Sequence, residues 1–459
     1  MAEAGRRRLV VLLVVAVAVV ASCGSDEPEI TIPDLRSSST RTATVPPETA
    51  TTEGSPMVAP DTDPSTFFVS PTVGDDGADG QTAEQPWRTL QPALDRLQPG
   101  HTLFLMDGIY TGGTEPGVAH FVINNGGTAD AWVRVTAAPG HRPEIVASDG
   151  NGISVRADYV EVGGLRVRGE GFDDDNHYGW GLLIRNSHHV RLVDNEVSDM
   201  AVGGISSVES SNLEILYNEV HGNAYWGPEQ GSGISIWHSR DAGLGPSPDG
   251  YHDRIIGNTV YRNENKVFSE WRDEPIITDG NGIIIDQSKE FGYTGRTLVA
   301  NNVVFDNGGR GILVLESSRV DIVFNTTYAN GRTEGLDGGP VELAAGRSDD
   351  VRILNNLAWS RPGAPAVIVA EATGVELGGN VLVTDNDATV ATELDVVTRV
   401  DPGLRSPGID PATADFRPLA TSLVIDAGLA VDPAIGIDAD GRQRIVGPPD
   451  VGAYEFATR

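Results

Sequence analysis

The 459-residue chain contains one cysteine, Cys23, and only two lysines, Lys266 and Lys289. A single cysteine excludes intramolecular disulfides and metal clusters held by several thiolates. Basic residues are scarce as a class, since 33 Lys and Arg stand against 65 Asp and Glu and give a formal net charge of −32. This balance argues against a nucleic-acid partner and against electrostatic docking on anionic lipid, because both require a basic surface.

Long apolar runs are also lacking. The run from Leu9 to Ala21 is too short to span a bilayer as a helix, and with Arg6-Arg7-Arg8 before it the order is typical of a secretory signal. It ends in a Val-Ala-Ser tripeptide before Cys23, which resembles the bacterial lipobox. We therefore expect residues 1–23 to be a lipoprotein signal, with Cys23 lipidated and the protein anchored to the cell membrane on its extracytoplasmic side. Residues 24–65 are rich in Ser, Thr and Pro and have no aromatic residue, which predicts a disordered tether.

The repeated part of the chain lacks the helix-period patterns of a helical solenoid and has a period-2 pattern instead. Asparagine recurs before short apolar segments, with steps of 23 to 44 residues, at Asn195, Asn218, Asn258, Asn302, Asn325, Asn356 and Asn380. Glycine opens a second set of alternating segments at Gly152, Gly181, Gly204, Gly233, Gly282 and Gly311. Short strands repeating about every 23 residues indicate coils that stack on one another. We expect the asparagines to form an amide ladder and to be turn residues that tolerate left-handed backbone geometry.

These patterns predict an all-β, right-handed parallel β-helix, expected to be a monomer. Residues 66–112 are expected to form an N-terminal strand and a capping helix at Leu90–Leu97 with Thr89 as its N-cap. The coils are expected to span residues 113–385, followed by a loop-rich closing segment at residues 386–459. Insertions in the coils are predicted at residues 169–177, 222–231, 239–254 and 263–296.

Both ends of this region resemble bacterial β-helix proteins of the pectin-lyase superfamily. The resemblance is carried by Phe67-Phe68-Val69-Ser70-Pro71 and Pro86-Trp87-Arg88-Thr89-Leu90 near the start, and by Asp438-Ala439-Asp440-Gly441-Arg442 and Pro449-Asp450-Val451-Gly452 near the end. It implies the fold over residues 66–459. It implies no single chemistry, because the superfamily contains lyases, hydrolases, epimerases and non-enzymes.

The additional residues of the irregular coils fall in two consecutive coils, around the strands expected at 233–237 and 282–286. Insertions on one face of a solenoid usually mark its binding face. Residues 217–271 are also rich in aromatic side chains, whose flat faces suit a sugar ring. The predicted substrate-binding residues are Trp226, Trp237, Trp271 and Arg185.

Period 2 places Ser235, Trp237, Ile284 and Asp286 on the outward side of these two strands. Asp286 is the one carboxylate among these positions, so it is the leading candidate for a catalytic acid or base. Glu274 and Asp279 lie in the neighbouring insertion and are its candidate partners. Two carboxyl groups can hydrolyse a glycosidic bond. A Lys or Arg base beside a calcium-bound uronate would instead support β-elimination.

The segment Asp279-Gly280-Asn281-Gly282-Ile283-Ile284 resembles the Asp-Gly-Asn-Gly-Phe-Lys segment of family 9 pectate lyases. In that family the lysine is the base, and here Ile284 takes its place. The family's calcium carboxylates would fall near Gly231, Ser232 and Ser235, none of which is acidic. A separate acidic loop could bind Ca²⁺ through Asp173, Asp174 and Asp175.

The sequence therefore predicts a protein that binds and cleaves a polysaccharide, by hydrolysis or by elimination. The alternative is a non-catalytic glycan-binding or adhesin-like surface protein. The charge of −32 repels polyuronates unless Ca²⁺ bridges them, so neutral glycans fit better.

Overall fold

The computed structural model describes residues 65–456, apart from residues 113–117, 149, 171–178, 244, 246, 248, 271, 434 and 445–446. The predicted lipidation site Cys23, the predicted calcium ligands Asp173, Asp174 and Asp175, and Trp271 lie outside the described residues. Within the described part, no helix is both long and apolar enough to cross a membrane.

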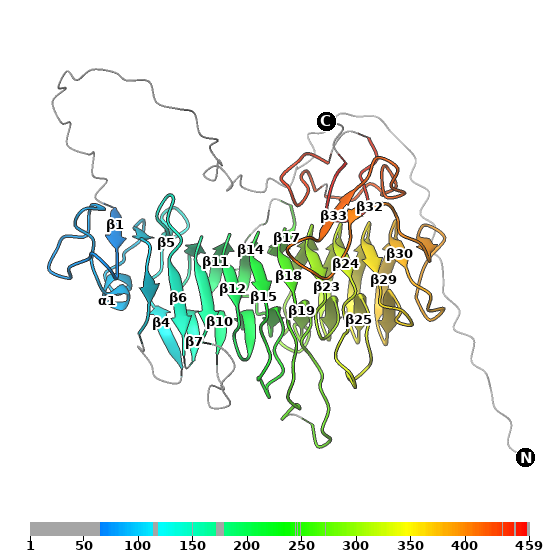
Figure 1. Ribbon diagram of the computed structural model, residues 1–459, viewed down its shortest axis with the longest axis horizontal. Coiled ribbons are helices and arrows are strands. Elements are labelled where there is room, and N and C mark those ends of the chain that lie inside the picture. Colours follow the sequence, from blue (N-terminus) through cyan, green and yellow to red (C-terminus); the bar gives the residue numbers. More distant parts are fainter. Residues whose placement is uncertain are drawn as a thin grey trace, which may run out of the picture.

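Three parallel sheets run along the length of the molecule (Figure 1). Sheet A contains β1 (Thr66–Val69), β2 (Thr102–Leu105), β5 (Val133–Ala137), β8 (Val160–Gly163), β11 (His188–Val193), β14 (Ser211–Leu216), β17 (Tyr251–Ile256), β20 (Arg296–Ala300), β23 (Ser318–Val323), β26 (Asp349–Leu354) and β29 (Thr373–Gly378). Sheet B contains β3 (Ile109–Tyr110), β6 (Glu144–Ala147), β9 (Arg166–Gly169), β12 (Glu196–Ser198), β15 (Glu219–His221), β18 (Thr259–Tyr261), β21 (Val303–Phe305), β24 (Thr326–Tyr328), β27 (Leu357–Trp359), β30 (Val381–Val383) and β31 (Val396–Thr398). Sheet C contains β4 (Ala119–Ile123), β7 (Asn151–Val155), β10 (Trp180–Arg185), β13 (Gly203–Val208), β16 (Ile234–Trp237), β19 (Ile283–Asp286), β22 (Ile312–Leu315), β25 (Leu343–Gly346) and β28 (Val367–Ala370).

Each coil passes from sheet C to sheet A to sheet B, and each strand pairs in parallel with its equivalents in the coils before and after. The right-handed parallel β-helix predicted from the repeat is confirmed. Alternate side chains fill the interior as period 2 requires, and Ile205, Ile234 and Ile283 of three successive sheet C strands are fully buried. The glycine at the start of these strands leaves room for a side chain of the core. A Cβ on Gly282, for example, would lie only 2.2 Å from Val304 Cγ1.

The predicted asparagine ladder is present. Each ladder amide after Asn195 accepts from the backbone N–H and the Nδ2 of the asparagine one coil earlier, as Asn302 Oδ1 does from Asn258 at 2.9 Å. The expected left-handed geometry, however, lies on the preceding residue of the turn, for example Tyr217 at φ 56° and Phe324 at φ 56°. The ladder residue itself must point inward, so the reversal of the chain is made one position earlier.

A second ladder was not anticipated. It links Asn223, Asn263, Asn307 and Asn330 through Nδ2-to-Oδ1 bonds of 2.8 to 2.9 Å. These residues lie five positions after ladder residues of the first set, at the other end of the short sheet B strands. This five-residue spacing is visible in the sequence and could have predicted the second ladder.

The ends of the solenoid differ from expectation in detail. The helix α1 (Leu90–Leu94) is shorter than the expected Leu90–Leu97, and Thr89 does not cap it with its side chain. Thr89 Oγ1 donates instead to Asp76 Oδ2 at 2.6 Å. Sheet B continues to β31, beyond the last coil expected at residue 385.

The closing segment folds back along the flank of the solenoid (Figure 1). It carries the antiparallel pair β32 (Leu404–Ser406) and β33 (Asp415–Pro418). Phe416 packs against Phe305 of sheet B, and Ile435 joins an apolar cluster on sheet A. Among the described residues, the apolar cluster on the outward face of sheet C includes none from this segment, and that face becomes the candidate site.

Candidate functional site

The outward face of sheet C carries two rows of side chains, fixed by the register of the strands. One row passes through Leu183, Ser206, Ser235, Ile284, Leu313 and Ala344. The other passes through Arg185, Val208, Trp237, Asp286, Leu315 and Gly346. The predicted outward positions are therefore correct.

The first row is largely closed off. Ile284 and Leu313 are buried in an apolar cluster with Val341, separate from the solenoid core. Nearby, Ile277 pairs with Leu336 through a backbone bridge. The Arg310 guanidinium ties the two segments together by donating to the carbonyls of Thr278 and Asp337. The second row, which we call the Trp237–Asp286 row, is the more accessible of the two, with Arg185 and Trp237 exposed.

Asp286 ends β19, between Trp237 of β16 and Leu315 of β22. Its Oδ1 is buried and has no hydrogen-bond partner among the described residues. Burial raises the pKa of this carboxyl to about 8, with further increases from the charges of Asp279 and Glu316 that the nearby Arg347 only partly offsets. Asp286 is therefore mostly protonated at neutral pH.

Asp279 is the second perturbed carboxyl of the region. Its Oδ2 accepts from Thr278 Oγ1 at 3.0 Å and its Oδ1 accepts from Asn281 Nδ2 at 2.7 Å. Burial raises its pKa to about 6, and these hydrogen bonds and the positive charge of Arg310 limit the increase. At pH 7 Asp279 is mostly ionised, so the two carboxyl groups differ in protonation state at that pH.

The other predicted residues are less closely connected to Asp286. Glu274 is exposed, and no ion pair involves its carboxylate within the described ranges. Trp226 is half-buried in the insertion before β16, with its backbone N–H donating to Ala201 O at 3.0 Å. Arg185 is exposed in the Trp237–Asp286 row but lies three strands from Asp286, or about 14 Å along the axis.

Two basic groups near Asp286 form ion pairs with acidic side chains. Lys289 Nζ lies 2.6 Å from Asp349 Oδ2, and Arg347 Nε lies 2.6 Å from Glu316 Oε1. The carboxylates that family 9 lyases use for calcium have no counterparts here, because Ser232 and Ser235 stand at those positions and Ser232 Oγ pairs with Asn281. In the part of the chain that the structure describes, no group of three or more His, Cys, Asp or Glu side chains is placed to hold a metal ion. The donor set on sheet C does not fit that family's calcium site.

Two residues that the sequence analysis did not assign to the site directly follow strands of sheet C. His238 and Gln287 occupy the corner after β16 and β19 in left-handed conformation, with φ of 55° each. Gln287 Oε1 contacts Trp237 Nε1 at 3.4 Å and His238 Nε2 at 2.6 Å. Their position, five residues after the strand glycine, was visible, but their side-chain direction was not.

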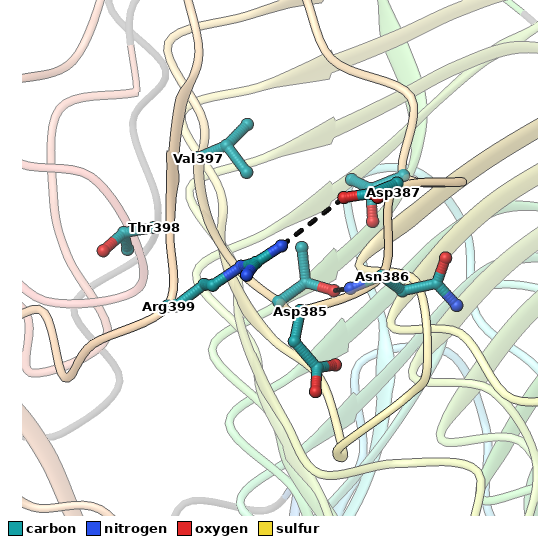
Figure 2. A pocket seen from close by; sticks show the side chains of 8 residues that line it. Asp385, Asn386, Asp387, Val397, Thr398 and Arg399 are labelled. Carbon is teal, nitrogen blue, oxygen red and sulfur yellow. Dashed lines mark hydrogen bonds and ion pairs between the residues drawn. The ribbon is translucent and has the colours of Figure 1, made fainter.

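A depression of about 450 Å³ lies elsewhere, over the end of sheet B (Figure 2). It is lined by Thr384, Asp385, Asn386, Asp387, Thr389, Val397, Thr398 and Arg399. Arg399 pairs with Asp387 at 3.5 Å, and Asp385 Oδ1 accepts from the Gly363 N–H at 2.7 Å. These side chains bond to one another and to the neighbouring backbone, so the Trp237–Asp286 row remains the candidate site.

Comparison with known proteins gives one curated relative. No family model matches the chain. The pectate lyase PEL9 of Emericella nidulans is 26% identical over 261 residues, which are 47% of this chain and 61% of that protein. The chain thus spans about 61% of the length of the curated relative, and the resemblance to family 9 pectate lyases is confirmed.

Two lyases are among the solved structures that the chain matches. Pectate lyase Pel9A has a TM-score of 0.49 at 18% identity, covering 85% of this chain and 96% of that one. A rhamnogalacturonan lyase has a TM-score of 0.42 at 17% identity, covering 69% of this chain and 87% of that one.

Proposed function

We propose that this protein hydrolyses a neutral polysaccharide on the Trp237–Asp286 row of sheet C. The observation that carries the proposal is Asp286 itself, a carboxyl on the accessible row with a buried, unpaired Oδ1 and a pKa of about 8. A protonated carboxyl can donate to a glycosidic oxygen as the bond breaks, which is the task of the general acid in a glycosidase.

Asp279 is the proposed partner. With a pKa of about 6 it is ionised when Asp286 is protonated, and it can accept a proton from the attacking water. Asn281 and Thr278 hold its side chain in place. Trp226 and Arg185 are proposed to contact the sugar chain farther from the cleaved bond, with Glu274 as an alternative partner to Asp286.

Elimination is less well supported, although the curated relative is called a pectate lyase. A lyase of that family needs a base where this chain has Ile284, and Ile284 is buried in an apolar cluster. Lys289 is occupied by Asp349. The charge of −32 would also repel a polyuronate.

The test uses the full-length chain on a panel of neutral and uronic polysaccharides, with Ca²⁺ and with chelator. Both new reducing ends and unsaturated-uronate absorbance are followed. We expect reducing ends on at least one neutral glycan, without unsaturation and without a need for Ca²⁺. Unsaturated products would contradict hydrolysis and redirect attention to Lys289 and Arg185.

A second candidate function is non-catalytic glycan binding. It is favoured by the exposed Trp237 together with the loss of the lyase base at Ile284. Retention by a polysaccharide without any product across the panel would support this candidate over the hydrolase.

We also propose that the protein acts outside the cytoplasm, tethered by a lipid on Cys23. The support is the order of segments in the first 23 residues: basic residues come first, an apolar run follows, and small residues precede Cys23. Cys23→Ala should move the protein from the detergent-soluble membrane fraction to the aqueous fraction in a bacterial host that processes lipoproteins. Unchanged partitioning of the variant would count against the lipid anchor.

A further inference from the structure

Trp237 is an exposed aromatic side chain at the centre of the Trp237–Asp286 row. The residue is 39% exposed, whereas tryptophan side chains are on average mostly buried. Its ring centroid lies 3.7 Å from that of His238, with an interplanar angle of 30°. One ring face of Trp237 is therefore backed by protein.

The backing continues through a stack of four side chains. His238 lies against Phe291 with ring centroids 4.0 Å apart and an angle of 29°. The Arg240 guanidinium covers Phe291 at 5.0 Å from the ring centroid, and Arg240 pairs with Glu209 at 2.9 Å. The outer face of Trp237 is the end of this stack that no described ring or guanidinium covers.

The backbone explains how neighbours in sequence can stack. Successive side chains of a strand point to opposite faces, but His238 has φ 55°, so its ring turns beneath Trp237. Gln287, which directly follows Asp286, then fixes both rings through Oε1, at 3.4 Å from Trp237 Nε1 and 2.6 Å from His238 Nε2. The orientation of the indole is tied to the same corner as the proposed acid.

We infer that the outer face of Trp237 is a binding subsite for a neutral pyranose ring, with His238, Phe291, Gln287 and Arg240 as positioning residues. The inference rests on the proposed function only in taking a polysaccharide as the ligand. A flat, electron-rich ring face suits the C–H face of a sugar. A rigid platform also loses little conformational freedom on binding.

The surroundings favour an uncharged sugar. Asp286 is adjacent to Trp237 in register, and Glu209 lies at the corner one coil earlier, where its N–H donates to Trp237 O. The cation of the stack, Arg240, is already paired with Glu209. A uronate carboxylate would find no free cation of the stack to bind it, and the net charge of −32 repels a polyanion.

The test measures binding without turnover. Full-length protein carrying Asp286→Asn is run through native gels that contain galactan, xylan, glucomannan or polygalacturonate. We expect retardation in at least one neutral gel and none in polygalacturonate. Adding Trp237→Ala should weaken that binding about tenfold or more, and Trp237→Phe less.

Two further variants test whether binding depends on the stack or on any exposed aromatic side chain. Phe291→Ala leaves the outer face of Trp237 in place but removes its support, so binding should weaken by an intermediate amount and Phe291→Tyr should restore it. Phe268, which is 59% exposed and outside the stack, supplies the control, since Phe268→Ala should leave binding unchanged. Equal losses from Phe268→Ala and Trp237→Ala, or full binding by Trp237→Ala, would overturn the subsite.

The subsite and the hydrolase can fail separately. If the wild-type chain forms no product but Trp237→Ala still abolishes retardation, hydrolysis is wrong and the subsite stands. If the wild-type chain cleaves a glycan and Trp237→Ala leaves its KM unchanged, the subsite is wrong and hydrolysis stands. Absence of binding to every polysaccharide overturns the subsite and leaves hydrolysis without a substrate in this panel.

Discussion

Asp286→Asn should lower the rate of polysaccharide hydrolysis by about a thousandfold or more, with substrate binding retained. Asparagine keeps the shape of the side chain but cannot donate a proton to the leaving oxygen, and general acid catalysis is typically worth about 10²- to 10⁴-fold. The measurement is the release of reducing ends from whichever neutral glycan the wild-type protein cleaves.

The pH dependence of the wild-type rate follows from the same two carboxyl groups. The rate of hydrolysis should fall as the pH rises through about 8, because Asp286 loses the proton it must donate. It should also fall below about pH 6, because Asp279 becomes protonated and can no longer act as the base. A rate that keeps rising above pH 9 would contradict the role of Asp286 as the acid.

A matched control is Asp253→Asn. Asp253 is likewise a buried acid whose pKa burial raises to about 6, but it lies on sheet A, where Tyr293 Oη donates to it at 2.7 Å. Its other oxygen accepts from the Leu213 N–H at 3.0 Å. Asparagine can keep that bond through Oδ1 and donate its Nδ2 to Tyr293 Oη, so the variant should keep its activity. Loss of activity in both variants would mean that buried acids matter here only for the fold.

Asp286→Asn should also stabilise the protein at neutral and alkaline pH. The folded carboxyl has a pKa of about 8, against 3.8 for the unperturbed group. Between these values the folded state retains a proton that the unfolded state releases, so the free energy of unfolding falls as the pH rises from about 4 to 8. Asparagine has no such dependence, and the gain should be a few kcal/mol above pH 8. Denaturant unfolding at pH 5 and pH 9 checks this, and an equal difference between variant and wild type at both values would refute it.

A group that is costly to the fold and needed for the reaction is typical of a site where function opposes stability. Loss of activity accompanied by gain of stability would therefore separate a catalytic Asp286 from an ordinary buried acid. A purely structural carboxyl would show the stability change alone.

The sequence was sufficient for the solenoid, because the rules that set it are local. Period 2 placed Trp237 and Asp286 outward, and the spacing of asparagines gave the length of the coil. Contacts between distant loops could not be read in this way. The bridge between Ile277 and Leu336 joins segments about 60 residues apart, and no repeat encodes it.

The platform beneath Trp237 was missed for a related reason. Its geometry depends on the left-handed turn at His238 and on Phe291, which comes from the following insertion. Sequence reasoning treats residues 237 and 238 as pointing to opposite faces. Left-handed residues in the other turns, such as Tyr217 and Phe324, likewise precede the ladder asparagines by one residue.

The ladders have a direction that accounts for how they end. Every amide donates through Nδ2 toward the next coil, so the last rung needs a partner that only accepts. Asn380 Nδ2 donates to Asp395 Oδ1 at 2.8 Å, and Asn330 Nδ2 donates to Glu342 Oε2 at 2.6 Å. A carboxylate meets this need without leaving a donor of its own unpaired.

Asn302→Ala should therefore be among the most destabilising substitutions in the chain, at about 2–4 kcal/mol of unfolding free energy. The change removes the acceptor for the Asn258 N–H and Nδ2, and it removes the donor to Ile255 O and Asn325 Oδ1, all at 2.9 Å and buried. Denaturant unfolding together with amide exchange of the neighbouring coils measures the loss.

Two companions test whether direction matters as well as burial. Asn302→Asp keeps the acceptor but loses both donors and faces the Oδ1 of Asn325 with a carboxylate, so it should cost at least as much at pH 7 and less at acidic pH, where it can regain a donor. Asn386→Ala removes two bonds of a partly exposed asparagine, to Gly363 O and from the Ala388 N–H, and should cost under about 1 kcal/mol. If Asn302→Asp were tolerated as well as Asn386→Ala, the amide donors would be dispensable. The coils would then be held by apolar packing alone, and the carboxylates at the ends of both ladders would lose their explanation.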